Sequence, residues 1–301
     1  MRALAKEWER KYKSIKAVRL IVQFGFLYVL NLGLGPYPYP LPILGSSAPW
    51  TTFPSAFDAL QVLIASGTPP LLPLASIIVS NILIGRVFCG WLCPFGLAQD
   101  LTALIGRAKR RIDPGTHKSL HVVKWLVLVA TLIAPLVICY VRLTGSIRPL
   151  EAYLPQGLTI SPYTLISPDS TLFSFVPIAI LMGMIPSSTG DILAAIFNPI
   201  IITRYLIFVL VLIAMAKIER FWCRYICPLG LMNSVVSKFS VLGFYKIASR
   251  CDNCGVCNRV CPVQIDIAGA KGGRLDMFEC IGCFQCYFAC ERKAIVLSYK
   301  L

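Results

Sequence analysis

Two matching stretches, RVFCGWLCPFGL at residues 86–97 and RFWCRYICPLGL at residues 220–231, indicate an internal duplication. Each places an arginine ahead of a Cys-x3-Cys-Pro motif, and each follows a long apolar run. Duplication of this kind in a membrane protein usually produces two halves related by a pseudo-two-fold axis. The two cysteine pairs lie at the same end of their apolar runs, so they could face one another.

The composition indicates a membrane protein. Of the 301 residues, 56% are hydrophobic and 14% are charged, whereas soluble domains have about 25% charged residues. The mean hydropathy is +0.71. The net charge of +15 fits the excess of Lys and Arg in cytoplasmic loops better than it fits nucleic-acid binding, which we do not expect.

Four stretches approach the roughly 20 apolar residues that a helix needs to cross the hydrocarbon core: residues 17–35, 71–88, 121–141 and 199–217. The first follows a basic N-terminus but lacks an Ala-x-Ala cleavage site, so it predicts an uncleaved anchor. A fifth stretch, residues 173–185, is shorter and contains a proline. It suits an interfacial or re-entrant segment better than a span.

The distribution of Lys and Arg predicts the orientation. Basic residues are concentrated in residues 1–16 and 107–118, whereas residues 36–70 contain none and residues 142–198 contain two. Cytoplasmic loops carry the excess of positive charge. We therefore expect a multi-pass protein of the inner, or cytoplasmic, cell membrane with its N-terminus in the cytoplasm.

Eight of the thirteen cysteines stand in two runs, CDNCGVCNRVCP at residues 251–262 and CIGCFQCYFAC at residues 280–290. Each run has the x2, x2, x3 spacing of bacterial ferredoxins, in which the fourth cysteine binds the other cluster. The alternative, a pair of zinc knuckles, needs only four ligands each, often with His. Because cluster thiolates must stay reduced, we expect this tail in the cytoplasm. The prediction is two [4Fe-4S] clusters, one bound by Cys251, Cys254, Cys257 and Cys290 and the other by Cys280, Cys283, Cys286 and Cys261.

The cysteines of each Cys-x3-Cys-Pro motif are four residues apart and share a helix face if the chain stays helical there. Each proline is expected to begin a new helix. The nearby Arg86 and Arg220, together with the helix N-termini, are expected to lower the pKa of Cys93 and Cys227. Three interpretations stay open: four sulfurs that hold one metal or cluster, two dithiol pairs for redox exchange, or buried structural cysteines. The candidate ligands are Cys89, Cys93, Cys223 and Cys227.

The chain resembles the membrane polyferredoxins of the NapH and MauN type, which are related to NosR and CcoG. The resemblance rests on the four apolar runs, the paired FCGWLCP and FWCRYICP segments and the two ferredoxin runs. It implies an iron-sulfur protein that relays electrons between the quinone pool, or a cytoplasmic donor, and a partner redox protein or oxidoreductase subunit. Whether the chain is itself an enzyme stays open, and a quinol dehydrogenase component is one possibility.

Several polar residues give weaker signals. His117 and His121 have metal-ligand spacing, but no carboxylate is near in sequence, so we expect interfacial polar residues. Asp58 and Asp191 occupy matching places in the two outer loops and are expected to cap helices or face solvent rather than accept a quinol proton. Arg204 is costly inside a span unless it is paired. No catalytic residue is predicted.

These patterns predict an all-α transmembrane domain of four spans, residues 1–245, with an internal pseudo-two-fold repeat. A small α+β ferredoxin-like domain with two clusters, residues 246–301, follows it. The alternative function is metal handling or cofactor assembly, such as copper reduction or delivery, through the four Cys-x3-Cys-Pro thiols. A third possibility is a membrane anchor for a larger oxidoreductase. The direction of electron flow does not follow from the sequence, because cluster potentials depend on burial and hydrogen bonding.

Overall fold

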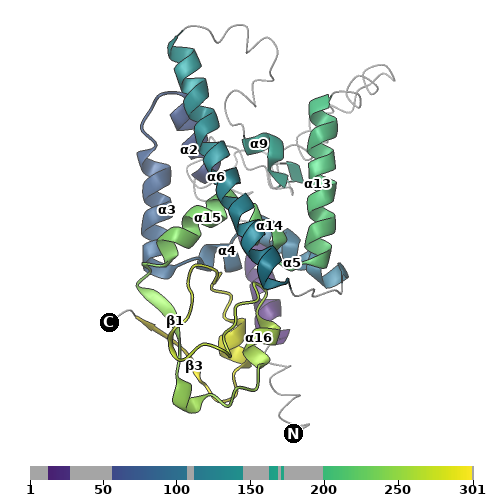
Figure 1. The fold of residues 1–301 in the computed structure, drawn as a ribbon, viewed down its shortest axis with the longest axis vertical. Coiled ribbons are helices and arrows are strands. Elements are labelled where there is room, and N and C mark those ends of the chain that lie inside the picture. The colour runs from purple at the N-terminus through teal and green to yellow at the C-terminus, as the bar shows by residue number, and fades with distance from the viewer. Residues whose placement is uncertain are drawn as a thin grey trace.

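The chain is arranged in three layers in the computed structural model (Figure 1). The structure describes residues 13–27, 56–106, 112–144, 163–168, 171–172 and 199–299. Long apolar helices form the upper layer, short helices that contain both Cys-x3-Cys-Pro motifs form the middle layer, and a unit with a β-sheet lies below. The predicted segment at residues 173–185 lies outside the described residues, as do residues 28–35 of the first predicted span.

Five labelled helices make up the upper layer, and a further helix covers residues 13–27. The labelled helices are α2 Ala56–Ala65, α3 Leu71–Ile84, α6 Pro114–Leu143, α9 Tyr163–Ile166 and α13 Pro199–Lys217. Although α2 comes from a loop that was expected to face outward, it packs against both α3 and α6. Part of that loop therefore turns back into the helical bundle.

Helix α6 contains the segment of the described chain that is long and apolar enough to cross a membrane, Gly115–Leu143. The helix begins at Pro114, and Asp113 caps it by accepting a hydrogen bond from the N–H of Gly115 at 3.0 Å. By contrast, α3 ends before the predicted boundary at residue 88, because Gly85 turns the chain with a φ of 64°. The set of four spans stays a prediction.

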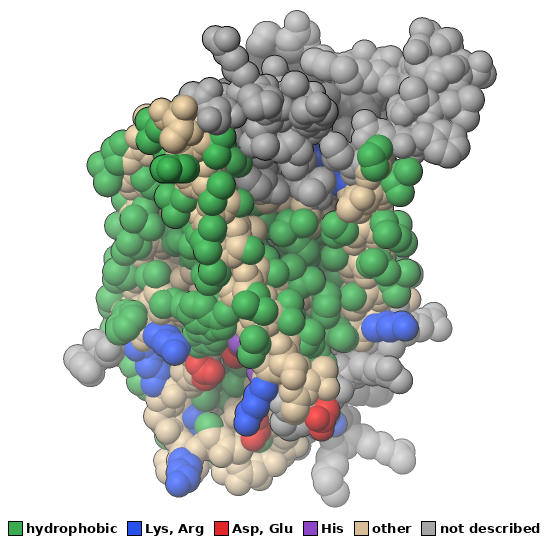
Figure 2. Space-filling view, turned by 45° about the horizontal axis from the view of Figure 1, so that its top comes forward, with side chains coloured by type: hydrophobic (Ala, Val, Ile, Leu, Met, Phe, Trp, Pro, Cys, Tyr) green, Lys and Arg blue, Asp and Glu red, His purple; other side chains and the backbone are tan. Residues whose placement is uncertain are grey.

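An exposed apolar belt covers the helices of the upper layer (Figure 2). Large hydrophobic side chains on three helices are mostly exposed: Leu71 on α3 at 70%, Leu126 on α6 at 63% and Leu210 on α13 at 57%. Soluble monomers rarely expose apolar patches of this extent. Most of the charged side chains in this view gather below the belt. This separation favours a membrane protein whose belt contacts lipid.

The middle layer consists of four short helices, two from each repeat. They are α4 Val87–Trp91, α5 Pro94–Gly106, α14 Phe221–Tyr225 and α15 Pro228–Ser237. The prediction that Pro94 and Pro228 begin helices is confirmed. Each proline-led helix packs against the apolar helix of the other repeat, α5 against α13 and α15 against α3. The two repeats are therefore interlocked.

The lower unit is built on a three-stranded antiparallel sheet with strand order β2-β1-β3. Its elements are β1 Leu242–Lys246, the 3-10 helix Ala248–Arg250, α16 Val256–Val260, β2 Gly273–Arg274, α17 Gln285–Ala289 and β3 Ile295–Tyr299. Tyr245 pairs with Arg274 on one side and with Val296 on the other. The sheet begins at Leu242, a few residues before the domain boundary predicted at residue 246. That boundary rests on the position of the cysteine runs, and no strand pattern enters the prediction.

A buried ion cluster joins the first helix to both repeats. Asp100 on α5 accepts from Nη2 of Arg19 at 2.6 Å, and from Nε and Nη2 of Arg220 at 3.0 and 2.5 Å. Burial opposes ionisation of Asp100, but the two guanidinium groups outweigh it and lower the pKa of that carboxyl. Sequence analysis missed this cluster, because nothing in the periodicity links residues so far apart.

We expect Asp100→Asn to lower the free energy of unfolding by about 3–5 kcal/mol, because it leaves two buried guanidinium groups without a counter-charge. Thermal or denaturant unfolding of the full chain in detergent measures the change. Asp113→Asn is the matched control, since Asn caps an exposed helix N-terminus about as well as Asp. Equal stability of the two variants would contradict a central role for the ion cluster.

Candidate metal centres

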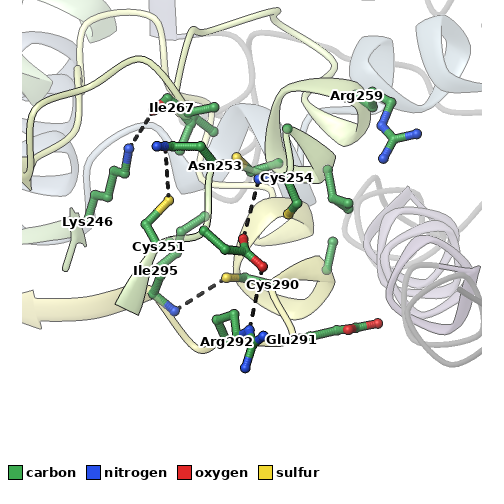
Figure 3. Close-up of a pocket in the computed structure, with 17 residues that line it drawn as sticks. Lys246, Cys251, Asn253, Cys254, Arg259, Ile267, Cys290, Glu291, Arg292 and Ile295 are labelled. Atoms are coloured by element: carbon green, nitrogen blue, oxygen red, sulfur yellow. Dashed lines mark hydrogen bonds and ion pairs between the residues drawn. The ribbon is translucent and has the colours of Figure 1, made fainter. Parts of the chain in front are cut away.

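The outer cysteine group consists of Cys251, Cys254, Cys257 and Cys290, which line one cavity of about 420 Å³ (Figure 3). The cavity opens to solvent at Cys254, which is exposed. Sulfur atoms here have hydrogen-bond donors nearby: the N–H of Ala294 donates to Sγ of Cys290 at 3.3 Å. The sulfurs thus converge where a soluble partner has access.

The inner cysteine group consists of Cys261, Cys280, Cys283 and Cys286, which line a much smaller cavity of about 20 Å³. Backbone N–H groups of Val263, Gln264 and Ile265 hydrogen-bond to the Cys261 sulfur, an arrangement that tunes iron-sulfur ligands. Burial raises the pKa of Cys261 and Cys280 to about 12. Without a metal these thiols stay neutral, so a thiolate role requires coordination.

The structure thus brings together the same two groups of four cysteines that the ferredoxin spacing predicted. The donor set of four cysteines per cavity, with backbone N–H groups directed at sulfur, fits a [4Fe-4S] cluster in each. That each group binds a cluster stays a prediction.

A third cavity, which we call the four-thiol cavity, lies between the two repeats. Its walls include Cys89, Cys93, Cys223 and Cys227, and its volume is about 50 Å³. Aromatic side chains, Phe88, Phe95 and Trp222 among them, close much of the remaining surface. Of the interpretations left open by the sequence, separate dithiol pairs are disfavoured, because both pairs border the same space.

Two amide side chains reach across the four-thiol cavity in a reciprocal pattern. Nε2 of Gln99, from the first repeat, donates to Sγ of Cys223 in the second at 2.9 Å. Nδ2 of Asn233, from the second repeat, lies 3.6 Å from Sγ of Cys89 in the first. Sequence analysis missed both residues, although alignment of the two repeats places them at the same position. Cys227 also accepts from the N–H of Gly230 at 3.2 Å.

The expectation of a lowered pKa beside the arginines is wrong for Cys93. Burial raises the pKa of Cys93, and the neighbouring Cys223 and Cys89 add to the shift. Burial also raises the pKa of Cys223, and Arg220 offsets only part of that effect. Desolvation outweighs charge because the cavity is enclosed by apolar side chains.

The lower unit touches the four-thiol cavity through the first motif. Trp91 donates from Nε1 to the carbonyl of Gly282 at 2.9 Å, and Nη1 of Arg86 donates to the carbonyl of Phe278 at 2.9 Å. Cys89 and Cys283 belong to one buried hydrophobic cluster. The inner cysteine group and the four-thiol cavity are therefore neighbours in the fold.

Close approach at this junction depends on Gly90. A Cβ there would overlap the carbonyl oxygen of Ile281 and lie 3.4 Å from the backbone nitrogen of Cys283. Gly282 faces α4 from the other side of the junction. Its φ of 62° lies in the left-handed region, and a side chain there would meet Val87. The two glycines let the backbones of α4 and the second ferredoxin run come into contact.

The two histidines gain a carboxylate partner through the fold. Nε2 of His121 is 2.7 Å from Oε1 of Glu279, and Nδ1 of His117 is 2.9 Å from the hydroxyl of Tyr225. The ligand atoms of His117, His121 and Glu279 lie within 4.8 Å of one another. However, Nε of Arg224 lies 3.5 Å from Oε2 of Glu279 and opposes the binding of a cation.

The remaining polar candidates are Asp58, Arg204 and Asp191. Asp58, from α2, lines the four-thiol cavity instead of a solvent-facing loop. Arg204 donates from Nε to the hydroxyl of Thr171 at 2.8 Å. Asp191, the carboxylate at the matching place in the second outer loop, lies outside the described residues.

Comparison with known families supports the assignment of iron-sulfur chemistry. One family model, described as a 4Fe-4S binding domain, matches twice, at residues 67–113 and 200–246. Another, described as a 4Fe-4S dicluster domain, matches residues 244–291. The double match confirms that the two halves are repeats, and the chain is an iron-sulfur protein.

Relatives cover most of the chain. Uncharacterized protein MJ0749 of Methanocaldococcus jannaschii is 28% identical over 73% of this chain and 68% of its own length. The ferredoxin-type protein NapH of Haemophilus influenzae is 25% identical over 71% of this chain and 63% of its own. The methylamine utilization ferredoxin-type protein MauN of Paracoccus denitrificans is 26% identical over 77% and 66%. No solved structure matches the chain significantly.

We expect Gly90→Ala to loosen the junction, because the added methyl displaces the carbonyl of Ile281. Hydrogen exchange of the backbone amides at residues 280–284 should become faster, and the lower unit should unfold at a lower temperature. Gly25→Ala is the control, since no described atom lies within 4 Å of its added Cβ and helix propensity favours Ala by up to about 1 kcal/mol. The same exchange rates in both variants would rule out the contact.

Proposed function

The chain is a relative of the NapH- and MauN-type polyferredoxins, and from this premise we propose that it relays electrons between the quinone pool, or a cytoplasmic donor, and a partner redox protein. The observation that carries the proposal is the grouping of eight cysteines around two neighbouring cavities. When bound, a [4Fe-4S] cluster accepts or donates one electron at a time. The protein binds the clusters, positions them and sets their electrostatic surroundings.

The cysteines divide into an outer and an inner set of ligands. Cys251, Cys254, Cys257 and Cys290 would hold the outer cluster, and Cys261, Cys280, Cys283 and Cys286 the inner one. Exposure of Cys254 supports an outer site that exchanges electrons with a soluble partner or a partner subunit. Burial of Cys283 and Cys286 supports an inner site that excludes water and faces the helices.

Residues 1–245 would form the membrane domain, with spans at 17–35, 71–88, 121–141 and 199–217, and residues 246–301 the cytoplasmic ferredoxin domain. The exposed apolar belt on α3, α6 and α13 supports the membrane placement. Thiolate ligands need a reducing compartment, which supports the cytoplasm for the cysteine-rich tail. Strand β1 would connect the two domains, since it follows α15 directly and pairs within the ferredoxin sheet.

Two clusters suit one form of this function, a component of a quinol dehydrogenase. Oxidation of one quinol releases two electrons and two protons, and two one-electron carriers take up the electrons singly. The reverse flow, from a cytoplasmic donor to quinone, needs the same two carriers. A quinone would bind among the membrane helices and exchange electrons with the inner side of the relay.

The test is anaerobic purification of the full chain in detergent, followed by addition of a water-soluble quinol. We expect electron paramagnetic resonance signals of reduced clusters to appear on addition. Cys254→Ala should lose about four irons, one cluster, whereas Cys139→Ala, which removes a cysteine of α6 far from both runs, should retain its iron. An iron-free protein would overturn the proposal, and clusters that ignore quinol but accept electrons from a soluble donor would remove its quinol branch.

A further inference from the structure

The four-thiol cavity has the donor set of a metal centre. Two cysteines from each repeat border one enclosed space, and the side-chain amides of Gln99 and Asn233 approach sulfur atoms of the opposite repeat at 2.9 and 3.6 Å. An N–H directed at sulfur stabilises a ligated thiolate. Cysteines with a purely structural role at a helix junction would need neither four thiols around one space nor amide N–H groups directed at sulfur.

The spacing of the sulfurs distinguishes a cluster from a single ion. Two sulfurs bound to one zinc ion lie at most about 4.6 Å apart, because each Zn–S bond is about 2.3 Å long. Among the described residues, the three ligand atoms found within 4.8 Å of one another are those of His117, His121 and Glu279, and no three cysteine sulfurs are that close. The four thiols form no such group, so their arrangement does not match ligands around a single ion, whereas in a [4Fe-4S] cluster each thiolate binds a different iron.

A buried cation lies beside the cavity. Arg86 is only 2% exposed, and its Nε and Nη2 atoms have no hydrogen-bond partner among the described residues. Nη2 of Arg86 lies 3.5 Å from the Cβ position of Gly230, which lines the cavity at the start of the second proline-led helix. A buried cation of this kind requires nearby negative charge, which a cluster with four thiolate ligands would supply.

We infer that Cys89, Cys93, Cys223 and Cys227 hold a third [4Fe-4S] cluster at the interface of the two repeats. The inference rests on the proposed function and extends it, because it continues the relay from the ferredoxin domain towards the membrane. Cys89 and Cys283 belong to one group of packed buried hydrophobic residues, and a Cβ built on Gly90 would lie 3.4 Å from the backbone nitrogen of Cys283. A third cluster held here would accept one electron from a reduced cluster at the inner ferredoxin site, so that the inner cluster would be oxidised and the third reduced.

Metal and sulfide analysis of the anaerobically purified full chain tests the inference. We expect about twelve irons and twelve sulfides per chain, three clusters, in the wild type. The double variant Cys89→Ala, Cys223→Ala should retain about eight, because the ferredoxin cysteines are intact. Cys139→Ala, the matched control for loss of a cysteine, should retain about twelve.

Each contrary result has a distinct meaning. About eight irons in both the wild type and the double variant would overturn the third cluster and leave the proposed relay intact. Eight irons accompanied by one zinc or copper ion that the double variant loses would also overturn it and favour metal handling by the four thiols. A wild type without iron would overturn both proposals.

A second variant keeps the inference testable if the double variant fails to fold. Gln99→Leu removes the amide that donates to Sγ of Cys223, so the cluster should remain while one reduction potential becomes more negative. Redox titration monitored by electron paramagnetic resonance measures this shift. Thr102→Val, on the same helix but bonded only to backbone carbonyls of α5, should shift none. Unchanged potentials in the Gln99 variant would overturn the assignment of these thiols as cluster ligands.

Discussion

The pairing of buried Arg220 is the interaction on which the arrangement depends. This guanidinium is 1% exposed, and it bonds to Asp100 through two nitrogens and to the carbonyl of Cys89 through the third at 2.8 Å. A buried cation is tolerable only when its donors are satisfied. Because its partners belong to the first repeat while Arg220 belongs to the second, satisfying this charge fixes how the two repeats meet. The four-thiol cavity is the space between them.

The repeats are not equivalent, and their difference positions the ferredoxin domain. Where the first repeat has Asp100, the second has Ser234, so Arg86 has no matching carboxylate. Arg86 instead donates to the carbonyl of Phe278 in the lower unit. A symmetric duplication would have paired both arginines internally. The loss of one carboxylate leaves one arginine available to hold the loop that precedes the second ferredoxin run.

The outer cysteine group differs from the other two in solvent access. It reaches solvent through Cys254, whereas the inner group and the four-thiol group each contain two buried and two partly buried cysteines. Solvent exposure and hydrogen bonds to sulfur change the potential of an iron-sulfur site. This difference offers a physical means of separating an outer site, open to the aqueous side, from two enclosed sites nearer the helices.

Sequence alone determined the features that local spacing encodes. The ferredoxin runs predicted the two groups of cysteines that meet in the fold, because the x2, x2, x3 interval is a property of the chain. Pro94 and Pro228 marked helix starts, because proline cannot donate a backbone hydrogen bond. Only the tertiary structure brought Gln99 to Cys223, Asp100 to Arg220 and Glu279 to His121. It also reversed the expected pKa of Cys93, because burial depends on neighbours from distant segments that enclose the thiol. Spacing along the chain fixes which atoms can bind one centre, whereas desolvation and charge pairing depend on what the fold places around them.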